Sequence, residues 1–335
     1  MKVITDESIE RLIQSAIYPS PHNTQPALWK IENDGRVYLN SNEDRWLKHG
    51  DPNKKDHCLA LGSALEAMAI ASTSFGLTLD QVEYHYEESI NTNKDNKLVA
   101  KAVLKRGSKL DPLFPMLEMR RCWRGKFMAE EKITLENIVN QLNSESLHII
   151  TGFDLISDCS AWYDKSTFEF LKDSEYEEEL FNWLRFLKTH PKYNEDGLNA
   201  DCLNLNVLEA TVAHFLYNPK RYKIIAHSLL AKMLCAEKGQ TKSAPFISLF
   251  LSNKEDSFFF AGRQMLKNWL KMTAMGYYGV PLSSLTDRKS TAELLTNAIG
   301  ISKRKQILFA MRCGRPVKKI PRSHRLPVEK IKIYD

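Results

Sequence analysis

Two apolar segments of equal length, 62–76 and 262–276, constrain the fold of this 335-residue chain more than any other feature. Both begin and end at glycine, both have the spacing of a buried helix, and Thr73 corresponds to Thr273. A repeat of this kind predicts a duplicated architecture, with one copy of the helix in each half. Five similar positions among fifteen can also arise by chance between two apolar helices, so the pattern leaves duplication and coincidence both open.

The hydrophobic pattern around these segments predicts an α+β fold in which helices cover mixed or antiparallel sheets. Residues 105–115 carry the glycine and prolines of a linker. We therefore expect two halves, 1–108 and 113–335, with a mostly helical insertion at about 155–242 in the second. The expected helices are 8–17, 57–75, 134–142, 257–275 and 292–299, and the expected strands are a pair within 29–39, a hairpin of 81–86 and 98–104, and 147–151, 245–251 and 306–312.

The charge balance is mildly basic, with 47 Lys and Arg residues against 41 Asp and Glu residues and a net charge of +6. This balance suits an anionic ligand, whereas a nucleic-acid-binding chain more often concentrates its charge in one block. The N-terminus lacks the apolar core of a signal peptide, and the weakly charged run 58–79 contains Glu66, which favours a buried helix over a membrane span. We expect a cytoplasmic protein without a membrane or nucleic-acid partner.

Several catalytic and metal-binding motifs are missing from the sequence. The six cysteines include no CxxC pair and the nine histidines show no metal-ligand spacing, so we expect reduced thiols and no metal site. The glycine-rich Rossmann and P-loop patterns, HExxH and GxSxG are absent as well. The sequence therefore gives no support to Rossmann-type dinucleotide binding, zinc proteolysis or serine hydrolysis.

The first motif that can carry chemistry is the loop Pro19–Pro26. Its prolines frame a rigid segment that presents compact polar groups, and hydroxyls and amides of this kind match the hydrogen-bonding edge of a planar heterocycle. The alternative is an ordinary polar turn between a helix and a strand. The candidate binding residues in the loop are Ser20, Pro21, Asn23 and Gln25.

The second motif is the basic run 120–127, with the sequence RRCWRGKF. Arginine binds phosphate oxygens in a bidentate manner. If the segment is extended, Arg120, Cys122 and Arg124 share one face, because alternate residues of a strand point the same way. The alternative is a solvated charged segment.

Two further segments complete the set of candidates. The C-terminal run 321–327, PRSHRLP, contributes Arg322 and Arg325, and its prolines and apolar neighbours favour a tail packed on the body of the protein over a solvated one. The run 279–284 follows the second long helix, and its small residues allow a flat ligand to approach the backbone closely. The alternative is a plain connection between helices. The candidates in this run are Pro281, Leu282 and Ser283.

Taken in this order, the four segments resemble the motifs of the nitroreductase-like FMN proteins, and the closer similarity is to the Acg-type branch, in which two nitroreductase-like halves are fused in one chain. The loop 19–26 resembles the family pattern PSxxNxQPW, and the run 120–127 resembles RRSxRxF. The resemblance implies a single-chain pseudo-dimer that binds FMN, with its phosphate held by Arg120, Arg124, Arg322 and Arg325 and with 280–284 against the ring. It implies no separate catalytic residue, since the flavin carries the chemistry.

The placement of the motifs sharpens this expectation. The loop pattern occurs only before the linker and the arginine pattern only after it, so the chain encodes the parts of one site rather than two. Three positions depart from the family pattern. Ala27 stands where the family has Trp, Cys122 replaces a serine, and Ser283 occupies a position that often carries an acidic residue. These changes leave flavin binding expected and put turnover in question.

Two main functions follow from the resemblance. The first is reduction of a small organic acceptor, a nitro compound or a quinone, with NAD(P)H by ping-pong flavin chemistry. The alternative is an FMN storage or sequestration protein, in which the insertion covers the flavin. A tailoring dehydrogenase that acts on a peptide and a protein that has lost its flavin are further alternatives. A fused chain can be a monomer or a homodimer.

Overall fold

The computed structural model describes residues 3–85, 96–107 and 109–334, and it contains two four-stranded antiparallel sheets with the same strand order. The first sheet has the order β1-β2-β4-β3 and the second the order β5-β8-β10-β9. The strands are β1 (Ala27–Ile31), β2 (Arg36–Asn42), β3 (Leu77–Tyr84), β4 (Asn96–Arg106), β5 (Leu147–Ile150), β8 (Phe246–Asn253), β9 (Tyr278–Pro281) and β10 (Lys305–Gly314). This arrangement confirms the predicted α+β fold with two halves.

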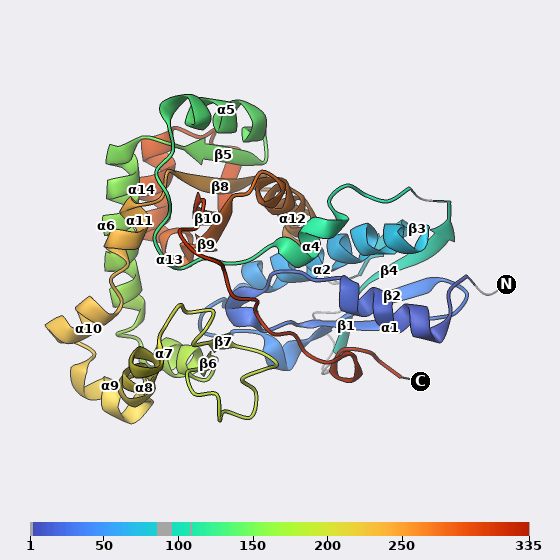
Figure 1. The fold of residues 1–335 in the computed structure, drawn as a ribbon, viewed down its shortest axis with the longest axis horizontal. Coiled ribbons are helices and arrows are strands. Elements are labelled where there is room, and N and C mark those ends of the chain that lie inside the picture. Colours follow the sequence, from blue (N-terminus) through green and yellow to red (C-terminus); the bar gives the residue numbers. More distant parts are fainter. Residues whose placement is uncertain (1–2, 86–95, 108, 335) are drawn as a thin grey trace.

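A long helix follows the second strand of each sheet. These helices are α2 (Lys55–Ser72) and α12 (Phe258–Ala274), and they pack against each other at the centre of the molecule (Figure 1). A β-carbon on Gly62 would lie 1.8 Å from the carbonyl oxygen of Phe259, and one on Gly262 would lie 2.2 Å from that of Leu59. Glycine at these two positions therefore lets the backbones touch. The two contacts are reciprocal, which is what the predicted duplication requires.

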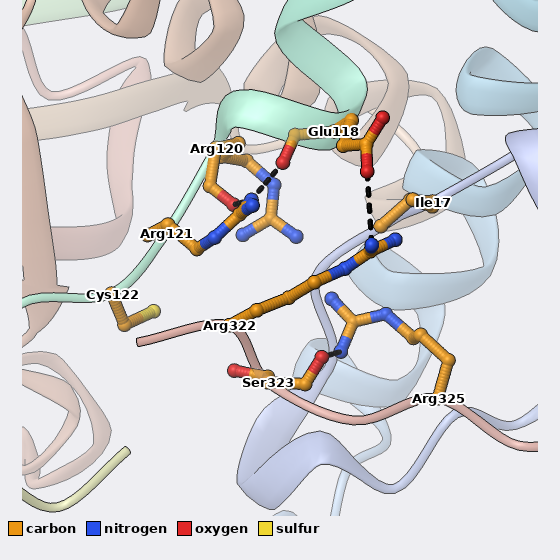
Figure 2. Close-up of a pocket in the computed structure, with 8 residues that line it drawn as sticks. All are labelled: Ile17, Glu118, Arg120, Arg121, Cys122, Arg322, Ser323 and Arg325. Atoms are coloured by element: carbon orange, nitrogen blue, oxygen red, sulfur yellow. Dashed lines mark hydrogen bonds and ion pairs between the residues drawn. The ribbon is translucent and has the colours of Figure 1, made fainter. Parts of the chain in front are cut away.

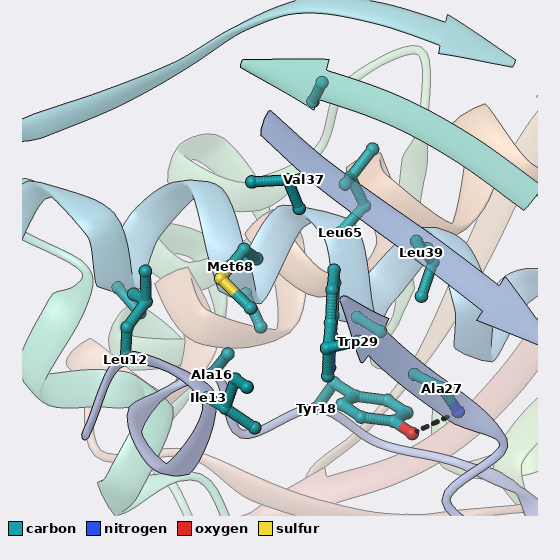
Figure 3. Packing of buried hydrophobic residues seen from close by; sticks show 14 of the residues in the cluster. Leu12, Ile13, Ala16, Tyr18, Ala27, Trp29, Val37, Leu39, Leu65 and Met68 are labelled. Atoms are coloured by element: carbon teal, nitrogen blue, oxygen red, sulfur yellow. Dashed lines mark hydrogen bonds between the residues drawn. The ribbon is translucent and has the colours of Figure 1, made fainter. Parts of the chain in front are cut away.

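The hydrophobic cores of the two halves share residues across this contact. Phe259, Leu266 and Leu270 of α12 belong to the core of the first half, which Figure 3 shows around Trp29. Leu59 of α2 belongs in turn to the core of the second half. Helix α2, continued to Phe75, is long and apolar enough to span a membrane, but 72% of its most apolar window is buried inside the protein. It is a core helix, as predicted.

The other helices cover the sheets and build the insertion of the second half. Residues 182–206 depart from the expected mostly helical insertion, since they form turns around a two-residue parallel pair. The physical reason is a buried ion pair, Arg185 Nη2 to Asp196 Oδ1 at 3.0 Å. The chain has to fold back as a loop to bring these two side chains together. The remaining elements are α1 (Asp6–Ser15), α4 (Phe114–Met119), α5 (Lys132–Leu142), α6 (Phe153–Phe170), α7 (Ser174–Phe181), β6 (Leu184–Arg185), β7 (Leu198–Asn199), α8 (Val207–Leu216), α9 (Pro219–Ile225), α10 (Leu229–Leu234), α11 (Lys238–Lys242), α13 (Ser283–Asp287), α14 (Lys289–Ile299) and the 3₁₀ turns η1 (Pro21–Asn23), η2 (Glu43–Arg45), η3 (Thr73–Phe75) and η4 (Val328–Lys330).

The C-terminal segment leaves β10 and crosses to the first half, where it runs beside β1 (Figure 1). The amide of Trp29 donates to Ile331 O and the amide of Ile333 donates to Trp29 O, both at 2.7 Å. The tail therefore pairs with the edge of the first sheet, and it carries the basic run 321–327 over the boundary between the halves. The expected strand 81–86 begins earlier, at Leu77, and most of the polar run 87–97 lies outside the described residues.

Candidate functional site

A small cavity lies where the end of α4, the segment after it and the C-terminal tail meet (Figure 2). Four arginines and one glutamate line it, so its walls carry an excess of three positive charges. The lining residues are Ile17, Glu118, Arg120, Arg121, Cys122, Arg322, Ser323 and Arg325. The structure thus brings together two of the basic motifs that the sequence singled out.

Arg120 forms the inner wall of this cavity. It follows the last residue of α4 and is 4% exposed, and its guanidinium carbon lies 4.8 Å from the centre of the Trp269 ring. Its Nε is buried without a hydrogen-bond partner, and no carboxylate among the described residues pairs with it. Burial, reinforced by the charges of Arg325 and Arg121, lowers the pKa of Arg120 to about 10. A buried charge of this kind is costly unless an anion compensates it.

Arg325 reaches the same cavity from the C-terminal tail. Its Nη1 donates to Asn23 Oδ1 at 3.0 Å and to His324 O at 2.8 Å, while its Nε is buried without a partner. Burial lowers its pKa to about 10, and the charge of Arg322 acts in the same direction. The bond to Asn23 joins the tail to the polar loop of the first half.

The remaining two arginines line the outer part of the cavity. Arg322 forms an ion pair with Glu118 at 2.9 Å, but both side chains are more than half exposed, so this pair contributes little. Arg121 donates to the main-chain oxygens of Glu118 and Arg120. Burial and the nearby Arg322 lower its pKa. Four guanidinium groups around one carboxylate favour a multiply charged anion such as a phosphate ester.

The polar loop Tyr18–Pro26 stands beside the cavity in an unusual backbone conformation. His22, Asn23 and Gln25 have φ values of 46°, 55° and 54°, in the left-handed region that non-glycine residues seldom occupy. Such strain persists only where the surroundings enforce it, and it is concentrated at functional sites. The Nδ1 atom of His22 is buried without a partner, and burial together with the charge of Arg124 lowers the pKa of this histidine to about 4.

Several polar groups of this loop hold the protein together. Leu326 N donates to Gln25 Oε1 and Gln25 Nε2 donates to Glu195 O, both at 2.9 Å. Ser20 Oγ accepts a hydrogen bond from the main-chain amide of Gln25 at 2.9 Å. The side chain of Gln25 therefore ties the loop to the tail and to the insertion, which leaves it little capacity for a ligand. Pro21 begins the turn η1 in the same loop.

The insertion supplies a third wall around the same region. Asp196, 1% exposed, accepts from Arg185 and also from Arg45 at 3.2 Å, and Arg45 donates to Thr24 O at 2.6 Å. Cys202 Sγ lies 3.3 Å from Ser323 Oγ of the tail. The loop between β6 and α8 therefore contacts both the polar loop and the basic tail.

Residues 120–127, all of them described, form no regular strand, so the shared face that an extended segment would give to Arg120, Cys122 and Arg124 does not arise. Cys122 forms a single parallel bridge with Gly279 of β9, and Arg120 belongs to the end of α4. As a result Arg121 lines the cavity, whereas Arg124 Nη1 lies 3.5 Å from Cys202 O. Side chains point alternately to two faces only in a strand, so Arg120 and Arg124 need not share a face here.

The fourth segment lies next to the second motif rather than in the cavity wall. The bridge from Cys122 to Gly279 places β9 beside the arginine segment. Pro281 and Ser283 are half-buried, and the Leu282 side chain is fully buried in a hydrophobic cluster, with its amide donating to Ala310 O. Of these three residues, Leu282 is the one whose side chain is committed to the core.

Sequence reasoning missed Arg121, Glu118, Ser323 and Arg312. Arg121 and Ser323 lie inside the motifs, but alternation in an extended segment turns Arg121 away from Arg120 and Arg124, and charge alone selects the two arginines of the tail. Arg312 on β10 is fully buried, with Nη1 2.6 Å from Glu237 Oε2 and Nη2 donating to Arg124 O at 3.1 Å. It joins the insertion to the arginine segment, and no sequence signal marks it. Among the described residues, no group of His, Cys, Asp and Glu side chains is placed to hold a metal ion, and all six cysteines are free.

No protein-family model and no curated protein matches this sequence. A search of solved structures finds oxidized iodotyrosine deiodinase bound to FMN and 3-iodo-L-tyrosine, at 13% identity and a TM-score of 0.35, over 64% of this chain and 94% of that one. It also finds nitroreductase A from Vibrio parahaemolyticus, at 14% identity and a TM-score of 0.35, over 66% and 73% of the two chains.

A third similar structure is the FMN-dependent nitroreductase NfnB from Mycobacterium smegmatis in complex with NADPH, at 15% identity and a TM-score of 0.35, over 66% of this chain and 96% of that one. Similarities with TM-scores this low carry no weight for what this chain binds or does. A function for this chain therefore has to be inferred from its arginine cavity.

Proposed function

We propose that this protein is an FMN-binding oxidoreductase of the nitroreductase type, which uses NAD(P)H to reduce a small organic acceptor such as a nitro compound or a quinone. One observation carries the proposal. The buried Arg120 and the half-buried Arg325 place two guanidinium groups in one cavity, each with a buried Nε that has no partner, and no described carboxylate pairs with either group. A phosphate ester supplies the missing charge and the missing acceptors.

The donor set fits the phosphate of FMN. Arg120 and Arg325 would hold it from the inside, and Arg121, Arg322 and the Ser323 hydroxyl would close the outer part of the cavity. Guanidinium groups remain charged at neutral pH even with a lowered pKa, so the cavity stays positive under working conditions. A phosphate oxygen would also relieve the repulsion between Arg120 and Arg325.

The segments around the cavity suggest where the ring would lie. The polar loop with Ser20, Pro21 and Asn23 meets the cavity through the bond from Arg325, and β9 meets it through the bridge at Cys122. We therefore assign the ring side of the ligand to this loop and to the residues after β9. The strained backbone of the loop supports the same assignment.

When bound, FMN supplies hydride acceptance from NAD(P)H and electron transfer to the acceptor. The chain binds the phosphate, Gln25 fixes the loop to the tail and to the insertion, and Asp196 holds Arg45 against the loop. Because one chain contributes both the loop and the arginines, a monomer contains a complete site. We also propose that the protein acts in the cytoplasm.

The proposal is tested first by comparing FMN with riboflavin, which lacks the phosphate. Flavin fluorescence quenching measures binding of each to the ligand-free protein. FMN should bind more tightly, and Arg120→Ala or Arg325→Ala should weaken FMN binding roughly ten- to a hundredfold, as expected for one charge-assisted hydrogen bond. Riboflavin binding should change little. Arg304→Ala, at an exposed arginine outside the cavity, is the matched control. Equal affinity for FMN and riboflavin would contradict the phosphate site.

The redox part of the proposal needs a separate measurement. The FMN-loaded protein is mixed anaerobically with NADH and with NADPH, and the flavin absorbance is followed. Bleaching by either nucleotide, followed by reoxidation with a nitroaromatic or quinone, is the expected result. Flavin that stays oxidised with both nucleotides and bleaches only with dithionite would contradict the oxidoreductase and leave the phosphate site intact.

A further inference from the structure

The helices α8, α9 and α10 carry a concentration of exposed apolar side chains that the flavin site does not explain. Of the seventeen large hydrophobic residues that are exposed in the described chain, eight lie between Val207 and Met233. We call the exposed surface of these three helices the apolar tip. Figure 1 shows these three helices at one corner of the molecule, away from both four-stranded sheets and from the boundary between the halves.

Helix α10 shows how unusual this surface is. It turns Ala231 inward, with Cys235 just beyond its end, while Leu229, Leu230 and Met233 are 72%, 45% and 66% exposed. The small side chains are buried and the large apolar ones face water, which reverses the normal preference. The large apolar side chains of such a helix leave water only when another surface covers its outer face, and their burial is then favourable.

Helix α8 repeats the pattern. It is a short, strongly apolar helix in which Ala210 is the buried residue, while Val207, Leu208 and Phe215 are 83%, 73% and 56% exposed. Helix α8 packs beside α9, and α9 packs beside α10, so the three helices form one surface. Contiguous exposed apolar surface of this kind marks an interaction site.

The tip also carries positive charge. From Ala210 to Ala236 the sequence contains Lys220, Arg221, Lys223 and Lys232 and no acidic residue. These four side chains are exposed. The nearest acidic group on α8, Glu209, is engaged in capping that helix, and Lys223 faces Glu177 of α7. The tip therefore combines apolar side chains with unbalanced positive charge.

A second copy of this chain fits this surface poorly. A symmetric dimer places the same patch on both partners, so the cationic groups would face each other. A protruding apolar surface is also unlike the concave sites that take small ligands. Short helices that present large apolar side chains flanked by Lys and Arg are typical of segments that lie in the interface of an anionic bilayer.

We propose that the apolar tip is a docking surface for an anionic lipid membrane. The outward side chains of α8 and α10 enter the interfacial region, and Lys220, Arg221 and Lys232 contact lipid phosphates. The sequence alone predicted no membrane partner. That expectation came from the absence of a spanning segment and did not consider how short helices are oriented by the core beneath them.

The experiment uses the full-length protein and sedimentation with vesicles of phosphatidylcholine, with and without phosphatidylserine. Binding should require phosphatidylserine and weaken with added salt. Leu229→Ser combined with Met233→Ser should weaken binding about tenfold or more, because two apolar side chains lose their burial. Lys220→Glu combined with Lys232→Glu should do the same through charge.

The matched control places the same chemistry elsewhere on the surface. Leu294→Ser with Val317→Ser removes two side chains that are 46% and 57% exposed and lie outside the tip. All three double variants should keep the wild-type melting temperature, because every changed side chain is exposed. No binding to anionic vesicles, or equal binding by the tip and control variants, would overturn the proposal. So would a wild-type dimer that the tip variant converts to a monomer without affecting vesicle binding.

Discussion

The carbonyl oxygen of Phe259 lies 1.8 Å from the position that a β-carbon on Gly62 would occupy. The carbonyl group cannot move aside as a flexible side chain would, because it belongs to the backbone of a packed helix. The contact fixes the closest approach of α2 and α12, the two helices on which both cores depend. Any side chain at this position has to force the halves apart.

Gly62→Ala should therefore destabilise the protein by about 3 kcal/mol or more, at the upper end of the range for overpacked cores. Thermal unfolding of the ligand-free protein measures it. Gly239→Ala is the control, because Gly239 is helical and a β-carbon there would have no neighbour within 4 Å. That variant should be neutral or slightly stabilised. Equal melting temperatures for the two variants would contradict the close contact.

Arg120 should cost the ligand-free protein stability, because burial and the neighbouring arginines oppose its charge. Arg120→Met is expected to leave the melting temperature unchanged or higher, after the loss of about 1 kcal/mol of cation–π attraction to Trp269. Arg185→Met should behave in the opposite way and lose about 3 kcal/mol, because it leaves the buried Asp196 carboxylate with less compensation. Denaturation without ligand tests both. A large loss in Arg120→Met would assign this arginine a structural role.

Gln25 should hold the C-terminal tail in place. Gln25→Ala leaves the amide of Leu326 and the carbonyl of Glu195 without their partner, at a cost of roughly 1–3 kcal/mol. The effect should be local, with faster hydrogen exchange in residues 320–334 and unchanged exchange in β8. Gln14→Ala, at an exposed position of α1, serves as the comparison. Unchanged exchange of the Leu326 amide would show that the tail is held by other contacts.

His22 should make the protein sensitive to acid. Its pKa in the folded state is lowered to about 4 by burial and by Arg124, whereas in the unfolded chain it takes up a proton near its ordinary value of 6.5. The unfolded state therefore binds more protons between these values, and stability falls as the pH is lowered through this window. The loss is on the order of 1–2 kcal/mol, allowing for partial exposure.

His22→Asn isolates this contribution, because asparagine tolerates the left-handed backbone that His22 adopts. The melting temperature of the variant should fall less than that of the wild type between pH 6.5 and pH 4, while the two should be similar at pH 8. His57, whose pKa is also lowered by burial, remains in both proteins and cancels in the comparison. Parallel pH profiles would contradict the assignment.

The sequence predicted the architecture because burial and chain topology leave periodic traces. The similarity between the two glycine-bounded helices predicts a duplicated architecture, and both sheets have the same strand order. The chemistry of Arg120, Arg322 and Arg325 marks them as candidates in the sequence, and all three line the cavity. The arginines of the tail reach Arg120 because the tail runs past β1. The residue pattern of the tail predicts that it packs on the protein, but it does not predict this path. Arg124 does not line the cavity, and the reason is local. Whether a short segment alternates depends on its hydrogen-bonding neighbours, and Cys122 has only one bridge.

The non-helical part of the insertion was also beyond local reasoning. Asp196 and Arg185 are eleven positions apart, and only the folded loop shows that they form a buried pair. The exposed face of α8 to α10 has the same origin. Helical spacing shows that one side of a helix is buried, but whether the small or the large apolar residues take that side depends on the space left by α6 and α7.

The crossing of α2 and α12 has a consequence for how this protein behaves on dilution. Where a site is formed between separate subunits, lowering the protein concentration dissociates them and abolishes the site. Here the contact between Gly62 and Phe259 is made within one chain, so the effective concentration of each half near the other does not depend on how much protein is present. The arginine cavity and the loop beside it should stay assembled even where only a few molecules are present in a cell.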